Sequence, residues 1–170
     1  MTTYVALLRA VNVGGTGKLP MTELKATCEE AGFSAPQTYI ASGNVVFDSP
    51  LGAADVKAAL ENRLEAYAGK PVAVMVRTAA EMAAIVDANP FPGVEGNRLV
   101  VMFLDDAPPV DAADQARNVA DEAIKPGKRE IYVHYPSGQG RSKLVIPAAK
   151  GATARNMNTV LKMAELAAGR

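Results

Sequence analysis

The first eighty residues alternate short apolar runs with stretches of helical spacing. An apolar run of strand length at 3–9 precedes a stretch in which Leu24 and Cys28 fall on one helical face. Further along, Leu60 and Leu64 are spaced by four, as on the buried face of a helix. The pattern predicts a strand at 3–9, a helix at 21–33, two strands within 37–49, a helix at 52–69 and a strand at 71–77. This order, βαββαβ, is the ferredoxin-like arrangement.

The pattern then begins again after a short helix at 79–88 and a linker rich in proline and glycine at 89–93. It predicts a strand at 98–104, a helix at 110–124, strands at 129–135 and 142–147 joined by a turn, and a helix at 153–168. This second half is βαββα and lacks the last strand of the βαββαβ order. The helix before the linker is a candidate to pack where that strand would lie. The first strands of the two halves start 95 residues apart, and the predicted hairpins keep nearly the same offset.

We therefore expect an α+β protein of two similar subdomains from an internal duplication. The expected boundaries are 1–78 for the ferredoxin-like subdomain, 79–97 for the helix and linker, and 98–170 for the second subdomain.

Composition bounds the function. The 170 residues are 49% hydrophobic, with 18 basic and 18 acidic side chains. Because these charges balance, the protein has no overall electrostatic field that would attract nucleic acid or anionic lipid. No stretch approaches the roughly 20 apolar residues of a membrane helix. One cysteine and one histidine cannot form an internal disulfide or build a structural zinc site by themselves. We expect a cytoplasmic protein, monomeric or weakly dimeric, without a metal or cofactor.

Charge is unevenly distributed along the second half. Between 79 and 124, nine acidic residues face two basic ones, a net charge of −7. Between 125 and 170, nine basic residues face two acidic ones, a net charge of +7. The two stretches either complement one another within the fold or leave a basic end for an acidic ligand or partner.

The stretch "RAVNVGGTGKLP" resembles a nucleotide-binding phosphate loop at first sight. Such a loop needs glycine four residues before its final Gly-Lys pair and a serine or threonine directly after it. Asn12 and Leu19 occupy those two positions, and Pro20 removes a backbone donor. The sequence therefore excludes the nucleotide-hydrolysing motif and leaves either a weaker anion site or a simple turn between strand and helix.

Topology brings this loop next to a second motif. In a βαββαβ sheet, the loop after the first strand and the turn between the second and third strands emerge at the same end. Arg9, Asn12 and Lys18 are therefore expected near Ser42 and Asn44. This rim has cations, amides and a hydroxyl but no base, so it predicts a site for phosphate or carboxylate.

A further polar cluster lies at the expected start of the last helix. Thr153 is a candidate N-cap, and Arg155 and Asn156 follow in the first turn. Asparagine is unfavourable inside a helix, so Asn156 either caps the terminus or joins the anion site.

Two other groups bear on possible chemistry. Tyr132 and His134 share one face of the strand at 129–135, where His134 is expected as a partly covered surface histidine; an exposed pair that stacks on bases is the alternative. Nucleic-acid binding through the basic C-terminal third is therefore an alternative function. Cys28 lies on the apolar helical stripe, as a buried small side chain would. The sequence shows no catalytic constellation, and the catalytic residues, if any, are unknown.

Four stretches together resemble a bacterial family called domain of unknown function 1697: "YVALLRAVNVGGTGKLPMTELK", "TYIASGNVVFDS", "ANPF" and "TARNMNTVLKMAEL". Ala10 stands where that family would have glycine, and Met157 where it would have an aromatic residue. The resemblance implies two similar α+β subdomains and no established reaction. Its motif positions coincide with the candidate ligand-binding residues Arg9, Asn12, Gly14, Gly15, Lys18, Ser42, Gly43, Asn44, Arg155, Asn156 and Thr159.

The leading hypothesis is a protein that binds a small anionic or phosphate-bearing molecule at the rim of the glycine-rich loop and the Ser-Gly-Asn turn. The second alternative, beside nucleic-acid binding, is a structural or protein-interaction module without a ligand site.

Overall fold

The computed structural model describes residues 1–12 and 18–170. Within them lie two four-stranded antiparallel sheets and four α-helices, which confirms the α+β class. The chain divides into two compact units, one of residues 1–84 with 162–170 and the other of residues 85–161. The helices at 79–87 and 157–168 therefore each contribute residues to both units.

The first sheet contains all the strands expected in the first eighty residues. Its elements are β1 (Thr2–Leu8), α1 (Met21–Glu30), β2 (Ser34–Thr38), β3 (Asn44–Ser49), α2 (Ala53–Ala68) and β4 (Val74–Thr78), with α3 (Ala79–Asp87) following. The strand order is β2-β3-β1-β4, and every neighbouring pair is antiparallel. The end of β1 consequently lies beside both the start of β3 and the start of β4.

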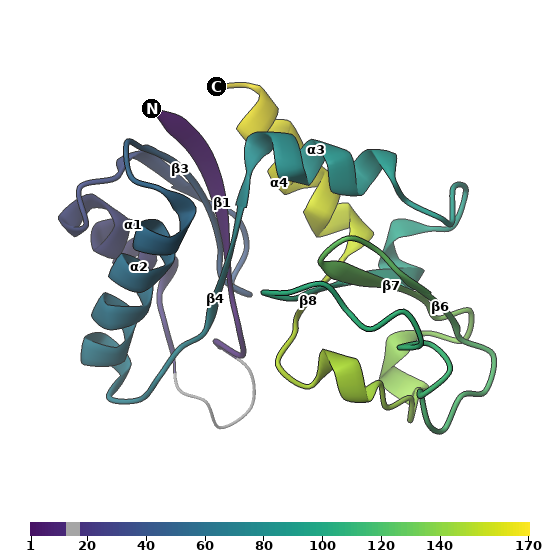
Figure 1. Cartoon of the computed structure of the whole chain (residues 1–170). Helices are drawn as coiled ribbons and strands as arrows, with labels where there is room; N and C mark the ends of the chain where they lie inside the picture. The colour runs from purple at the N-terminus through teal and green to yellow at the C-terminus, as the bar shows by residue number, and fades with distance from the viewer. Residues whose placement is uncertain (13–17) are drawn as a thin grey trace. The chain divides into compact units, whose positions relative to one another are not determined.

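Helices α1 and α2 cover one face of this sheet, as Figure 1 shows. Leu24 and Cys28 of α1 and Leu60 and Leu64 of α2 are buried there, on the faces that the four-residue spacing predicts. Truncation of such a leucine to alanine typically costs about 2–5 kcal/mol. The strand side chains that complete this core alternate along β1, β3 and β4: Tyr4, Ala6, Leu8, Val45, Phe47, Val74 and Val76.

The opposite face of the first sheet is also buried, which the alternation of β4 illustrates. Met75 and Arg77 point away from the helix-covered core, and Arg77 is only 2% exposed. A buried guanidinium needs hydrogen bonds, and its Nη1 donates one to Val76 O at 3.1 Å. The last residues of the chain belong to this unit too, where Arg170 lies 3.4 Å from the Asp48 carboxylate.

The second sheet is built differently from the expectation. Its elements are β5 (Leu99–Phe103), β6 (Ala123–Pro126), β7 (Glu130–His134) and β8 (Thr153–Asn156), followed by α4 (Met157–Ala168). The strand order is β6-β7-β5-β8, again antiparallel throughout. Loops and 3₁₀ turns cover one face of it, and they bury Leu104, Ala112 and Ile146 against Ile131 and Val133.

The predicted helix at 110–124 is wrong. The segment forms turns, Arg117 makes an isolated bridge with Val145, and Asn118 has a φ of 59° that ends any right-handed helix. Its last residues belong to β6, which forms a hairpin with β7 through the turn after Pro126. The alanine-rich composition favours a helix locally, but sheet pairing overrides a weak intrinsic preference.

The predicted strand at 142–147 and the predicted start of the last helix are also wrong. Only Val145 of that strand pairs, through the bridge to Arg117. Residues 153–156 form β8, which pairs with β5, and the helix begins at Met157. Buried Thr153 and Arg155 alternate with exposed Ala154, a period of two typical of a strand. A strand, rather than the helix before the linker, therefore completes the second sheet.

Among the described residues, no helix is long and apolar enough to cross a membrane.

Candidate functional site

Asn12 closes the loop that leaves β1. Its Nδ2 donates to Leu19 O at 2.8 Å and to Ala41 O at 2.7 Å, and its Oδ1 accepts from Leu19 N at 2.6 Å. Both amide hydrogens are therefore used within the protein. Its φ of 57° lies in the left-handed region that asparagine tolerates. Asn12 thus holds the two ends of the loop together and ties them to the segment before β3.

The Ser-Gly-Asn turn packs directly against the same end of β1. Leu8 N donates to Gly43 O at 2.9 Å, and a Cβ at Gly43 would lie 2.8 Å from Val11 Cγ2 and 2.9 Å from Leu8 Cβ. Gly43 also has a φ of 92°, so both the lack of space for a Cβ and the backbone conformation require glycine here. Asn44 is fully buried, and its Nδ2 donates to Tyr39 O at 2.8 Å and to Ser42 Oγ at 2.9 Å. The turn brings the loop and β3 together through its own internal bonds.

A pocket of about 690 Å³ opens between the loop after β1, the last turns of α2 and the segment that leads into β4. Eight of its twelve lining residues are apolar. Leu64 and Val72 are buried members of the hydrophobic core that also line the pocket. Tyr67, one turn after Leu64 on α2, is 48% exposed. The pocket therefore has an apolar floor and an aromatic side chain at its mouth.

Three cations line this pocket. Arg9 and Lys18 lie near the two ends of the connection between β1 and α1, and Lys70 follows α2, so two connections that are distant in sequence contribute these charges. All three residues are exposed. No acidic residue is among the described residues that line the pocket. The described lining therefore carries positively charged side chains and no negatively charged one, which favours a bound anion.

The end of α2 shapes this field. Gly69 terminates the helix in the left-handed conformation, and its N–H donates to Glu65 O at 2.8 Å. The carbonyl end of a helix carries partial negative charge, which a cation at Lys70 offsets.

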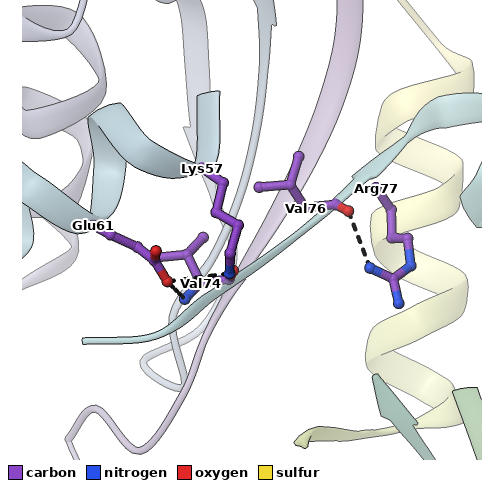
Figure 2. A network of polar contacts seen from close by, with 5 residues as sticks. All are labelled: Lys57, Glu61, Val74, Val76 and Arg77. Carbon is purple, nitrogen blue, oxygen red and sulfur yellow. Dashed lines mark hydrogen bonds and ion pairs between the residues drawn. The ribbon is translucent and has the colours of Figure 1, made fainter. Parts of the chain in front are cut away.

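The wall of the pocket before β4 is held by a network from α2, shown in Figure 2. Arg9 N donates to Ala73 O, so the next residue, Val74, turns its backbone groups away from β1. Glu61 Oε2 accepts from Val74 N at 2.9 Å, and Lys57 Nζ donates to Val74 O at 2.5 Å. Lys57 and Glu61 also form an ion pair of 3.1 Å. Two side chains thus occupy the outer edge of β4 and position its first residue.

The predicted site residues divide into four groups. Arg9 and Lys18 line the pocket, whereas Asn12, Gly43 and Asn44 make the internal contacts that shape its surroundings. Ser42 accepts the hydrogen bond from Asn44. Gly14 and Gly15 lie outside the described residues. The remaining three candidates, Arg155, Asn156 and Thr159, belong to the second unit.

The second-unit candidates have structural contacts of their own. Asn156 Oδ1 accepts from Thr159 N at 3.0 Å, so Asn156 caps α4. Arg155 is 9% exposed on β8, and its Nη1 donates to Ala154 O at 2.9 Å. Burial lowers the pKa of Arg155 to about 10. Thr159 is buried in the first turn of α4.

Lys70 and Tyr67 are pocket residues that the sequence reasoning missed. The available signal was the strand order, because the antiparallel pairing of β1 with β4 places the residues before β4 beside those after β1. A lysine in the short connection between α2 and β4 was therefore a candidate neighbour of Arg9.

The alternative of an exposed Tyr132–His134 pair that stacks on bases is wrong for Tyr132, whereas His134 is partly covered, as favoured from the sequence. Tyr132 is 2% exposed, and its hydroxyl donates to Ile85 O at 2.7 Å. Burial, with a smaller contribution from Glu130, raises the pKa of Tyr132 to about 12. His134 is half-buried, with its ring centroid 5.8 Å from that of Phe91. Tyr132 cannot stack on a base from this position.

Cys28 is buried in the core below α1. Burial, and to a lesser extent the Glu29 carboxylate, raises its pKa to about 12. A thiol that stays protonated is a poor nucleophile and a poor metal ligand. The described residues also contain no group of three or more histidine, cysteine, aspartate or glutamate side chains that could hold a metal ion.

The fold and the pocket define an α+β protein of two antiparallel sheets with a cationic pocket at one end of the first. The chain belongs to the family described as Protein of unknown function (DUF1697), whose model matches residues 1–132. This finding confirms the resemblance drawn from the sequence motifs. The structure of conserved bacterial protein SP0830 from Streptococcus pneumoniae is similar, with a TM-score of 0.82 and 24% identity over 99% of each chain. At that identity the likeness supports the fold alone. No curated protein matches the chain at a significant level.

Proposed function

We propose that this protein binds a small anionic or phosphate-bearing molecule in the pocket lined by Arg9, Lys18 and Lys70. The observation that carries the proposal is the convergence of three cations, two from the connection between β1 and α1 and one from the end of α2, on one concave site whose described lining residues include no acid. The proposed site therefore lies beside the residues that precede β4 and not at the Ser-Gly-Asn turn, where Asn44 donates to Tyr39 O and Ser42 Oγ.

The charges have a physical reason to attract a ligand. Like charges that share one pocket repel each other, and an anion between them relieves that repulsion while it forms charge-assisted hydrogen bonds. Each such bond at an exposed site contributes on the order of 1 kcal/mol, about fivefold in affinity. Salt screens exposed charges, so binding should weaken as ionic strength rises.

Isothermal titration of the full chain with phosphate and pyrophosphate tests the proposal at low and moderate salt. We expect saturable binding that weakens about fivefold or more in Lys18→Ala and Arg9→Ala. Lys25→Ala is the matched control, because Lys25 is an exposed lysine of α1 in the same unit and does not line this pocket. Equal weakening in Lys18→Ala and Lys25→Ala would indicate nonspecific attraction. No saturable binding to the wild-type chain would leave the motifs a structural or protein-interaction role.

We further propose that the two sheets derive from one duplicated ferredoxin-like unit. The support is their common antiparallel order, because β2-β3-β1-β4 and β6-β7-β5-β8 place the strands of each half in the same sequence. Loops in the second half stand where α1 and α2 stand in the first. A family member with helices at those two loop positions would support this origin.

A further inference from the structure

We infer that the ligand of this pocket is a phosphate monoester with a flat, largely apolar ring, of which a nucleoside monophosphate is the test case. This inference rests on the proposed function and adds the organic half of the ligand to it. The cations account for a phosphate, but they occupy only a quarter of the lining: three residues of twelve. A bare phosphate would leave the apolar majority of the pocket in contact with water.

The size of the pocket points to a larger molecule than phosphate. Its volume of about 690 Å³ falls within the range of sites for drug-sized ligands, roughly 300–1,000 Å³. Such sites combine an apolar lining with a few placed polar groups. Here the apolar lining and the cations belong to the same cavity, so an occupant with one charged end and one apolar end matches it.

Tyr67 favours a flat ring over a flexible chain. It lies three residues after Leu64, on the same side of α2, and both line the pocket. Nearly half of its surface is exposed, so an aromatic face is available for stacking. Base stacking on an aromatic side chain is worth roughly five- to one-hundred-fold in affinity.

Titrations with four probes distinguish recognition of the ring from the binding of the anion, which is the proposed function. The probes are adenosine monophosphate, adenosine, glucose 6-phosphate and inorganic phosphate, added to the full chain at one ionic strength. We expect adenosine monophosphate to bind about tenfold or more tightly than phosphate or glucose 6-phosphate, because only it offers both the anion and the ring. Adenosine should bind more weakly than its monophosphate, since it lacks the charge.

Variants of Tyr67 localise the ring. Tyr67→Ala should weaken adenosine monophosphate about fivefold or more and leave phosphate affinity unchanged, whereas Tyr67→Phe should retain both. If Tyr67→Ala unfolds, Tyr67→Leu preserves the apolar bulk and still removes the aromatic ring. Equal affinities for all three phosphates, or no effect of Tyr67 on any of them, would overturn the inference and leave the anion site standing. Absence of binding by every phosphate probe would overturn the proposed function and the inference together.

Discussion

Replacement of Asn12 by alanine tests whether this residue closes the loop or contacts the ligand. The substitution removes the donors to Leu19 O and Ala41 O and the acceptor of Leu19 N. Three net hydrogen bonds in a half-exposed loop are worth about 2 kcal/mol in total. Alanine at the observed φ of 57° adds about 1 kcal/mol of backbone strain. We therefore expect Asn12→Ala to lower the free energy of unfolding by about 3 kcal/mol.

Asn12→Gly is the matched control, because it removes the same three bonds and tolerates the left-handed backbone. It should cost about 1 kcal/mol less than Asn12→Ala. Urea denaturation followed by far-UV circular dichroism measures both, since the chain has no tryptophan for fluorescence. A loss below about 0.5 kcal/mol in both variants would refute the closing role of Asn12.

The remaining predictions concern the backbone and the core. Ala10 has a φ of 55°, so Ala10→Gly should raise the free energy of unfolding by up to about 1 kcal/mol, a gain that denaturation should detect. Gly43→Ala should lower it by more than about 2 kcal/mol, because the new Cβ meets Leu8 Cβ and Val11 Cγ2; a stable variant would contradict the close packing. The pKa of Cys28 is raised from 9.0 to about 12, so its contribution to stability is complete below pH 9 and is lost as pH rises toward 12. Stability at pH 10 relative to pH 7 should fall less in Cys28→Ala than in the wild type.

The sequence predicted the first half well because its local and tertiary signals agree. The four-residue spacing of Leu60 and Leu64 defines a helix whose face meets the sheet, and Gly32 and Gly69 stand where helix ends require positive φ. The proximity of the loop after β1 to the Ser-Gly-Asn turn followed from strand order alone.

The second half failed where the two signals conflict. The segment from 110 to 124 has helix-forming composition, and its tertiary contacts, among them those with β7 and Val145, decide its conformation. The Pro126-Gly127 pair was a turn signal inside the sequence, and it marks the hairpin between β6 and β7.

For the candidate site, the sequence motifs indicated Arg9 and Lys18 but not the other charged and aromatic residues that line the pocket. Motif residues such as Asn12 and Asn44 are polar because the backbone of the loop and turn needs their amides. The pocket residues Tyr67 and Lys70 stand outside any motif, and only the tertiary fold brings the end of α2 and the segment before β4 beside Arg9.

The most direct test of the anion pocket is a ¹H–¹⁵N correlation spectrum of the full chain during titration with pyrophosphate. The account predicts saturable shifts at the pocket-lining residues that have an amide N–H: 9–11, 18, 19, 64, 67, 68, 70, 72 and 73. Saturable shifts centred on residues 42–44 or on the start of α4 would contradict it, as would a spectrum that pyrophosphate leaves unchanged.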